Sequence, residues 1–367
     1  MIEIGSEFWL NDELKAEKVS SIPTWLELGN DNALLLSGRS AIDYVLKDIM
    51  KYRKLSTVYF PSYCCQSMLH PFIDNDIHVE FYDVYYDEYN EGKLSFNINV
   101  NQDCDVFFAM NYFGFTDGRM DDFIDKFKEK NIIVIEDSTH SLLSDFPCNK
   151  NSDYVIASIR KWLPVISGGL ASKIQGEFSV RTSEETLHEM VKLRKSAMLD
   201  KARYIQGDET VEKANFLQKY SSSNEILLKD YSMYRIDNES LQYLHQTNKK
   251  TIVRSRRNNA KVIYDMFNEL NEIKPLFPAL NDDDCPLFVP VTMNGKIRDL
   301  LRIYLIKNNV YYPIHWPKPT IMLKQEILVN IIDNELSLIC DQRYSVSDIE
   351  YSVQIIKNFF EEQGIDK

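Results

Sequence analysis

The sequence predicts an α/β protein in which a doubly wound, mostly parallel sheet of seven strands, flanked by helices, precedes a smaller α+β domain. Two observations favour this fold class. From residue 30 to about 175, short apolar runs alternate with amphipathic, charged stretches, which is the pattern of successive strand–helix units. The chain has 367 residues, 44% of them hydrophobic, so it is long enough to bury two cores.

The first half of the chain contains all the strands of the predicted large sheet. These strands are Ala33–Leu36, Thr57–Phe60, His78–Tyr82, Asp105–Met110, Ile132–Ile135, Tyr154–Ala157 and Gly169–Ser172. The apolar spacing of helices occurs between them in Ser40–Tyr52, Gln66–Ile73 and Met120–Lys130. Long charged helical stretches follow in Glu184–Tyr204 and Asn215–Tyr220, and we expect them to cover the sheet or to reach toward a partner subunit.

The last third of the chain predicts a separate, smaller unit. A helical pattern spans Ile252–Leu270, and two prolines follow it. The next pattern is strand–helix–strand, at Phe288–Val291, Ile297–Asn308 and Val310–Tyr312, and a final helical pattern spans Val346–Phe360. We therefore expect an N-terminal arm at 1–29, a large domain at 30–250 and a small α+β domain at 251–367.

Composition narrows the class of function. The formal net charge of −13 would repel a phosphate backbone, so we expect no nucleic-acid partner. The six cysteines form neither a CxxC pair nor a regular framework, which favours reduced thiols over disulfides or a metal site. The N-terminus is acidic and precedes no apolar segment, and nowhere do ~18 apolar residues run together. We therefore expect a cytoplasmic protein without a membrane partner.

Two residues, Lys161 and Asp137, indicate pyridoxal phosphate (PLP) chemistry. Lys161 follows the predicted strand Tyr154–Ala157 and precedes Ser167-Gly168-Gly169, whereas Asp137 ends the apolar run Ile132–Ile135. A buried carboxylate would keep the pyridine nitrogen of PLP protonated, and a lysine amine would attach the cofactor and move protons. Taken singly, such a lysine is more often a surface residue and such an aspartate a helix cap or turn residue. Their order, spacing and flanks favour the functional interpretation.

A phosphate site is predicted at the first turn from a strand to a helix. Ser37, Gly38, Arg39 and Ser40 lie there, and a helix N-terminus exposes backbone N–H groups that bind anions. A glycine turn with an ordinary helix cap would look the same in sequence. The position at the first turn of an α/β core favours phosphate binding, and Ser158, three residues before Lys161, would add a hydroxyl group.

The order of these motifs resembles that of the DegT/DnrJ/StrS aminotransferases, which are PLP enzymes of fold type I. The motifs are Ser37–Ala41, Tyr59–Tyr63, Met110–Gly114, Glu136–His140, Ser158–Lys161 and Ser167–Gly169, with Tyr231–Arg235 and Tyr312–His315 as further landmarks. The resemblance covers roughly residues 30 to 345. It implies a homodimer with active sites at the subunit interface.

The resemblance also implies a role for each matching residue. Lys161 would carry PLP, Asp137 would pair with the ring nitrogen, and His140 would lie near the phenolic oxygen. The phosphate would be held by Gly38, Arg39, Ser40 and Ser158. The segment Tyr231–Arg235 of the other subunit would approach it, with Arg235 or Tyr234 making the contact. Tyr63 or Tyr112 would stack on the ring, because the position that the family normally uses for stacking falls nearest Cys65.

Three departures from the family pattern affect these expectations. Arg39 stands where the family has threonine, Met233 where it has an asparagine that reaches across the dimer, and Ser167 where it has glutamate. We therefore expect a rebuilt phosphate site in which the guanidinium group of Arg39 binds in a bidentate manner.

The resemblance implies an aminotransferase that moves an amino group from an amino acid, with glutamate as the expected donor, to a keto-sugar. The sugar would be nucleotide-linked, as in surface polysaccharide or secondary-metabolite biosynthesis. We expect His315, Trp316 and Arg343 to bind substrate, although His315 and Arg343 could equally be a loop residue and a solvated arginine. A PLP lyase or acyl-transfer enzyme acting on an amino acid is the alternative. A third possibility is a non-catalytic relative of the family. The presence of Lys161, Asp137 and His140 argues against it.

Overall fold

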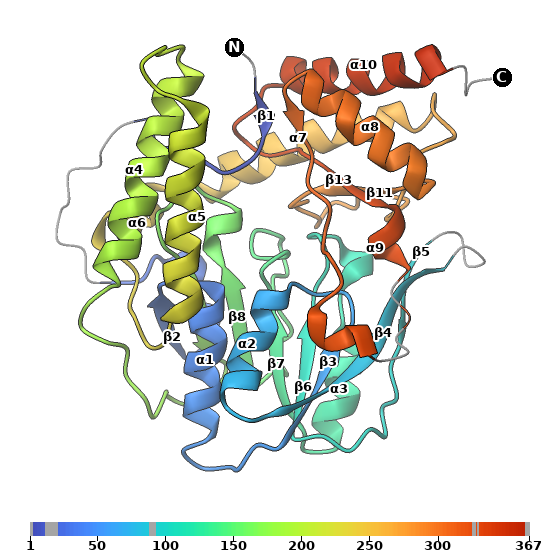
Figure 1. Ribbon diagram of the computed structural model, residues 1–367. Coiled ribbons are helices and arrows are strands. Elements are labelled where there is room, and N and C mark those ends of the chain that lie inside the picture. The colour runs from blue at the N-terminus through green and yellow to red at the C-terminus, as the bar shows by residue number, and fades with distance from the viewer. Residues whose placement is uncertain (1–2, 12–20, 88–92, 325–327, 329, 364–367) are drawn as a thin grey trace.

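The computed structural model, shown in Figure 1, describes residues 3–11, 21–87, 93–324, 328 and 330–363. Its centre is an eight-stranded sheet in the order β2-β9-β8-β7-β6-β3-β4-β5. The strands are β2 (Asp31–Leu35), β3 (Thr57–Pro61), β4 (His78–Asp87), β5 (Lys93–Asn97), β6 (Val106–Met110), β7 (Ile133–Asp137), β8 (Tyr154–Ser158) and β9 (Gly169–Lys173). Strands β4, β3, β6, β7 and β8 are parallel, whereas β2, β9 and β5 run antiparallel to their neighbours.

All seven predicted strands are present, but the predicted number of strands is wrong by one. The additional strand is β5, which pairs with the second half of a long β4 from Asp83 to Asp87. Lys93–Asn97 carries only two large apolar residues, Leu94 and Phe96, in alternation with polar ones. Such a short alternation is weak evidence for a strand, and the pairing with β4 is what fixes it.

Helices cover both faces of the sheet because successive strand residues point to opposite sides. Val106 and Phe108 pack in the same core as apolar residues of α1 (Gly38–Ile49) and α2 (Gln66–Asp74). Phe107 and Ala109 pack instead with α3 (Asp121–Glu129) on the other face. The strands are therefore buried on both sides, as parallel strands normally are.

A helical hairpin follows the sheet. It consists of α4 (His188–Ile205) and α5 (Lys213–Lys229), which stand side by side next to the β2 edge in Figure 1. The chain then returns to the sheet: the N–H group of Leu36 donates to the carbonyl of Tyr234 at 3.0 Å, and that of Ile236 donates to Leu34 at 3.1 Å. Helix α6 (Asn238–Gln246) follows this contact.

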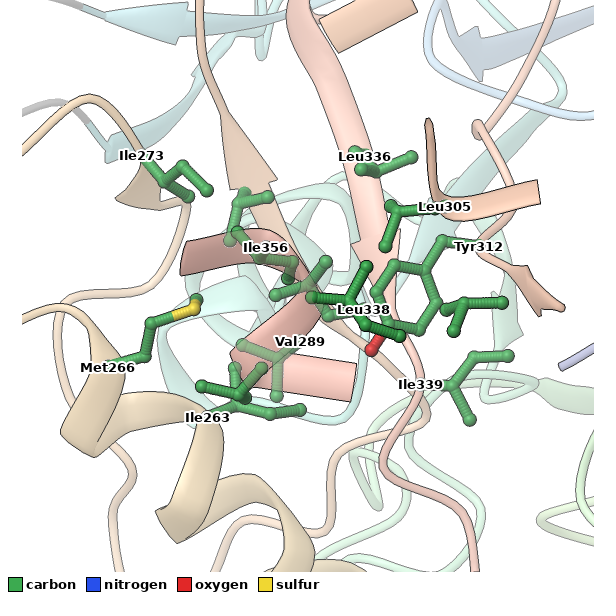
Figure 2. Packing of buried hydrophobic residues seen from close by; sticks show 14 of the residues in the cluster. Ile263, Met266, Ile273, Val289, Leu305, Tyr312, Leu336, Leu338, Ile339 and Ile356 are labelled. Atoms are coloured by element: carbon green, nitrogen blue, oxygen red, sulfur yellow. The ribbon is translucent and has the colours of Figure 1, made fainter. Parts of the chain in front are cut away.

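The C-terminal part is built around a three-stranded antiparallel sheet in the order β10-β11-β13. Its elements are α7 (Lys249–Met266), β10 (Lys274–Pro275), β11 (Val289–Thr292), α8 (Gly295–Lys307), β12 (Val310–Tyr311), α9 (Ile331–Asn334), β13 (Glu335–Leu338) and α10 (Val346–Gln363). Figure 2 shows how apolar residues of α7, β11, β13 and α10, among them Ile263, Val289, Leu338 and Ile356, form one core. The N-terminal β1 (Ile4–Gly5) pairs with β12, so the start of the chain packs on this C-terminal part.

Candidate active site

A cavity of about 120 Å³ lies at the carboxyl ends of the parallel strands. It is lined by Ser37, Gly38, Arg39, Ile42, Cys65, Ser67, Met68, Asp137, Thr139, Ile156, Ser158, Arg160, Lys161 and Leu227. These residues come from the start of α1, the region between β3 and α2, the ends of β7 and β8, and α5. Ligand sites of α/β sheets form at this edge because the loops that follow the strands meet there.

A larger hollow of about 450 Å³ lies between α4 and α5, where Asp200, Arg203 and Lys219 contribute to its lining. None of the residues expected to be functional lines it. The smaller cavity is therefore the candidate active site. Among the described residues, no group of three or more His, Cys, Asp or Glu side chains could hold a metal ion, and no helix there is long and apolar enough to cross a bilayer.

Lys161 ends a short 3₁₀ helix (Ile159–Lys161) that directly follows β8. Its Nζ atom lies 3.4 Å from Nε2 of His140 and 5.3 Å from the centre of the Trp316 ring. Burial, reinforced by the charge of Arg160, lowers the pKa of Lys161, although Cys65 and Asp137 act in the opposite direction. These surroundings favour the neutral, nucleophilic form of the amine.

The tautomer of His140 follows from its neighbour Phe113. The main-chain N–H group of Phe113 donates to Nδ1 of His140 at 3.1 Å, so Nδ1 carries no proton. Burial, together with Lys161 and His315, holds the pKa of His140 well below its usual value. The neutral ring therefore keeps its proton on Nε2, which faces Nζ of Lys161. An N–H donor in this position fits a neutral lysine amine as the acceptor.

Asp137 is the last residue of β7 and is fully buried. One of its oxygens accepts a hydrogen bond from the N–H group of Thr139 at 2.7 Å, and the Thr139 hydroxyl in turn accepts from the N–H group of Ser158 at 2.9 Å. Burial raises the pKa of Asp137, against the effects of Thr139 and Lys161. A cation brought next to this carboxylate would therefore stabilise its ionised form.

Trp316 lies against the histidine that faces the lysine. Its ring stacks on that of His140 with centroids 5.5 Å apart and lies 4.9 Å from the Tyr63 ring. His315 adjoins the same group: its Nδ1 atom lies 2.8 Å from the Ser337 hydroxyl, and its ring centroid is 6.3 Å from that of His140. The structure thus brings both residues of this loop next to the lysine, behind the cavity lining.

Tyr63 and Tyr112 do not lie where the sequence analysis expected a ring-stacking residue. Their rings stack on each other with centroids 5.6 Å apart, and the Tyr112 hydroxyl donates to the carbonyl of Tyr63 at 2.8 Å. Both side chains are fully buried in an aromatic cluster. No aromatic side chain of the described residues lines the cavity, and Cys65 lies there instead. The expectation for both tyrosines is corrected accordingly.

The expected phosphate turn forms the other end of the cavity. Ser37 caps α1 by accepting a hydrogen bond from the N–H group of Ser40 at 3.2 Å, and the hydroxyl groups of these two serines lie 3.0 Å apart. A side chain at position 38 would place its Cβ atom 3.0 Å from Cβ of Ser158, so glycine allows the turn to approach β8 closely. Ser40 belongs to the cap and does not line the cavity.

Arg39 was expected to bind phosphate in a bidentate manner, but its guanidinium group bonds to the main chain instead. Its guanidinium group donates to the carbonyl of Leu227 at 2.9 Å and to that of Ser67 at 3.3 Å, and it lies 5.4 Å from the Tyr231 ring centre. Two of its five N–H groups are therefore used to join the start of α2 to the end of α5. Arg39 still lines the cavity, but part of its donor capacity is already satisfied.

Arg160 is a cavity residue that the sequence analysis missed. Its Nε and Nη1 atoms are buried and have no hydrogen-bond partner in the described part of the chain. Burial lowers the pKa of Arg160 to about 9, with a further contribution from Arg194. The only sequence signal was its position beside Lys161, which does not reveal that the guanidinium group is buried without a partner.

Two other arginines lie outside the cavity lining. Arg343 forms two hydrogen bonds with Asp341, at 2.9 and 2.7 Å, and donates to the carbonyl groups of Ser6 and Glu7 at 3.2 Å. It holds the N-terminal segment, which corrects its expected role in substrate binding. Arg235 lies beside β2 and donates to Asn238. Its expected contact with a second subunit remains a prediction.

Comparisons with known proteins identify the fold. No family model matches the sequence, and no curated protein matches it. Aminotransferase TlmJ from Streptoalloteichus hindustanus is similar over 91% of this chain and 86% of that one, with a TM-score of 0.61 and 14% identity. PseC from Helicobacter pylori is an aminotransferase involved in pseudoaminic acid biosynthesis. It is similar over 90% of this chain and 87% of that one, with a TM-score of 0.62 and 13% identity.

A third similar structure is a DegT DnrJ EryC1 StrS aminotransferase from Brucella abortus, with a TM-score of 0.57 and 15% identity over 89% of this chain and 85% of that one. In each case the similarity extends over both the large sheet and the C-terminal part, because it covers about nine tenths of the chain. These comparisons confirm the predicted fold class: the chain has the fold of these aminotransferases.

Proposed function

We propose that the protein is a PLP-dependent aminotransferase that moves an amino group from an amino acid, with glutamate as the expected donor, to a nucleotide-linked keto-sugar. One observation carries this proposal: the amine of Lys161, the carboxylate of Asp137 and the N-terminus of α1 converge on one cavity. Two structures of the same fold support the cofactor and the substrate class. Spr1654 from Streptococcus pneumoniae has a PLP form and a PMP form, and DesI was solved in the presence of its TDP-sugar product.

The residues of the cavity fit PLP. The first N–H groups of α1 and the Ser158 hydroxyl suit a phosphate, Asp137 suits a protonated ring nitrogen, and Lys161 suits the aldehyde. Two nitrogen atoms of Arg160, which lines the cavity, are buried without a partner among the described residues, and this supports an anion as the ligand. When bound, PLP supplies an electron sink that stabilises negative charge at the α-carbon of an amino acid.

The chain's own groups supply the proton transfers. Lys161, kept neutral by burial, removes the α-proton of the amino donor and returns a proton to the acceptor carbon. The N–H group at Nε2 of His140 orients the lysine amine between these steps, because Phe113 fixes the tautomer of the ring. Trp316 shields the amine from water on one side, and we propose that Trp316 and His315 also form part of the wall for the sugar ring.

We also propose a cytoplasmic homodimer with active sites at the interface, in which Arg235 approaches the phosphate of the other subunit. The hairpin next to the cavity exposes Leu217 and Leu228 on α5, at 49% and 48% of their surface, which supports a contact there. Sedimentation should show a dimer, and Arg235→Ala should weaken PLP binding. A monomer with full activity at low concentration would contradict this arrangement.

The division into 1–29, 30–250 and 251–367 remains our proposal for the domains. The helix α7, which begins at Lys249, supports a boundary close to residue 250.

The alternative of a PLP lyase or acyl-transfer enzyme required an arginine for the α-carboxylate of an amino acid. Arg343 was the candidate in the sequence, and its bonds to Asp341 remove that support.

A two-step assay tests the proposed function. The purified protein loaded with PLP is incubated with single amino acids, and conversion to PMP is followed by absorbance. We expect conversion with glutamate and then reoxidation by a member of a panel of nucleotide keto-sugars. Release of a fragmented or acylated amino acid, without formation of PMP, would instead establish the lyase or acyl-transfer alternative.

A further inference from the structure

Arg160 is unusual among the cationic residues around the cavity. Two of its guanidinium nitrogen atoms are buried without any hydrogen-bond partner among the described residues. Arg39, the other arginine of the cavity lining, donates instead to two carbonyl groups. A buried charge that lacks a partner destabilises the folded protein. Such a group is retained more easily where a ligand completes its hydrogen bonds, and Arg160 lines the cavity beside Lys161.

The charges around Arg160 favour an anion. Burial, Arg194 and Arg39 all disfavour the protonated form of Arg160, and Glu7 alone among the groups that shift its pKa acts in the opposite direction. Glu7 is already paired with Arg194 at 2.7 Å. Arg160 and Arg194 thus share one carboxylate, although the whole chain has a net charge of −13. The excess of positive charge is local to this end of the cavity.

The N-terminus of α1 contributes donors at the same end. The cap at Ser37 satisfies the N–H groups of Ser40, through the serine hydroxyl, and of Ala41, through the main-chain carbonyl. Gly38 and Arg39, the first two residues of α1, line the cavity. In a helix the first N–H groups have no partner within the helix and carry its partial positive charge. They therefore form an anion site that faces the same cavity as Arg160.

We propose that Arg160 binds the phosphate group of PLP together with the N–H groups at the start of α1 and the hydroxyl of Ser158. In this arrangement Arg160 supplies the guanidinium contact that was expected of Arg39. The location supports phosphate over a substrate carboxylate, because Arg160 lies two residues after Ser158, and Ser158 packs directly against Gly38 at the start of α1. The inference rests on the proposed cofactor.

Arg160→Met removes the charge and the hydrogen bonds while keeping a long side chain. We expect this variant to bind PLP about 10- to 100-fold more weakly, which is the usual effect of losing hydrogen bonds to a charged group. Its affinity for pyridoxal, which lacks the phosphate, should be unchanged. Arg160→Lys, which keeps the charge but not the planar fork, should show an intermediate loss. Arg254→Met, at an exposed position of α7, is the matched control and should bind PLP like the wild type.

A second measurement uses inorganic phosphate with the protein free of PLP. Phosphate should raise the melting temperature of the wild type and of Arg254→Met but not that of Arg160→Met, because only the first two keep the complete anion site. If Arg160→Met does not fold, the comparison is made with Arg160→Lys, which should be stabilised less than the wild type.

The outcomes separate this inference from the proposed function. Unchanged PLP affinity in Arg160→Met, with a raised KM for glutamate, would show that Arg160 binds the substrate carboxylate and would overturn the inference. Failure of the wild type to attach PLP would contradict the proposed function. The phosphate titration would still decide in that case whether Arg160 completes an anion site.

Discussion

The two ends of the cavity differ in how many of their polar groups find hydrogen-bond partners within the protein. At the lysine end, Lys161 faces His140, His140 is held by the N–H group of Phe113, and Trp316 packs on both side chains. At the phosphate end, two nitrogen atoms of the Arg160 guanidinium group are buried without a hydrogen bond to any described residue. Both ends lie in one cavity formed by the same sheet edge.

This difference indicates which part of the site is preorganised and which part needs its ligand. The lysine end is fixed by packing and by hydrogen bonds within the chain, so the geometry that we propose for proton transfer forms on folding. The phosphate end stores unsatisfied donors, so binding of an anion there should stabilise the folded protein. Substitutions at the lysine end should therefore affect turnover, whereas substitutions at the phosphate end should affect cofactor affinity.

The largest effect is expected from Lys161→Ala. Turnover should fall by about four orders of magnitude or more, because the substitution removes the residue that we propose to hold the cofactor and transfer protons. The circular dichroism spectrum should remain that of the wild type. Lys192→Ala, at an exposed position of α4, serves as the control and should keep full activity. Residual activity of Lys161→Ala close to that of the control would place the reactive lysine elsewhere.

The next largest effect is expected from Asp137→Asn. A neutral amide cannot hold the ring nitrogen protonated, so turnover should fall by about 100-fold or more while PLP stays bound through Lys161 and the phosphate end. Steady-state kinetics and a PLP titration measure the two quantities separately. Near wild-type transamination would exclude Asp137 as the partner of the ring nitrogen, and loss of all bound PLP would point to a structural role.

An effect on stability is expected from the buried histidine of the C-terminal loop. Burial, with the charge of Lys161, lowers the pKa of His315 from 6.5 to about 3. Between these values the unfolded chain binds a proton that the folded protein does not, so the His315 contribution to stability is lost as the pH falls below 6.5. At pH 5 this loss amounts to ~2 kcal/mol.

Comparison of His315→Gln with the wild type isolates this contribution. Burial raises the pKa of the neighbouring Glu335 to about 8, so its own contribution grows as the pH falls and opposes that of His315. Urea unfolding at pH 7 and pH 5 should show that His315→Gln loses less stability, or gains more, than the wild type on acidification. An identical pH dependence of both proteins would contradict the neutral, buried state of His315.

The smallest effect is expected from Arg39→Met. The guanidinium group of Arg39 already donates to Leu227 and Ser67, so its removal should weaken PLP binding by less than about tenfold. The affinity of this variant for PLP, measured beside that of Arg160→Met, compares the two arginines directly. A larger loss for Arg39→Met than for Arg160→Met would reverse the assignment of the phosphate contact.

The sequence predicted the elements and residues that a local pattern determines. Asp137 and Lys161 were proposed because they lie at the end of an apolar strand and just after one, and Gly38 because it opens the first helix of the core. All three line the cavity. Strand β5 was missed because its alternation is short and depends on pairing with β4. Contacts between distant residues left no local signal.

Three arginines illustrate that limit. In the sequence, Arg39, Arg160 and Arg343 are equivalent charged residues near motifs. Only the structure shows that Arg39 bonds to two carbonyl groups and that Arg343 is held by Asp341. It also shows that two nitrogen atoms of Arg160 are buried without a partner in the described part of the chain. The same applies to Tyr63, whose place in the chain suggested ring stacking but whose side chain packs in an aromatic cluster.

The most direct test of the account is to identify the residue that PLP modifies. The protein is incubated with PLP, reduced with borohydride and digested, and the labelled peptide is sequenced by mass spectrometry. The account predicts a single label on Lys161, together with an absorbance band of lysine-bound PLP before reduction. A label on another lysine, or no band at saturating PLP, would contradict the assignment of this cavity as a PLP site.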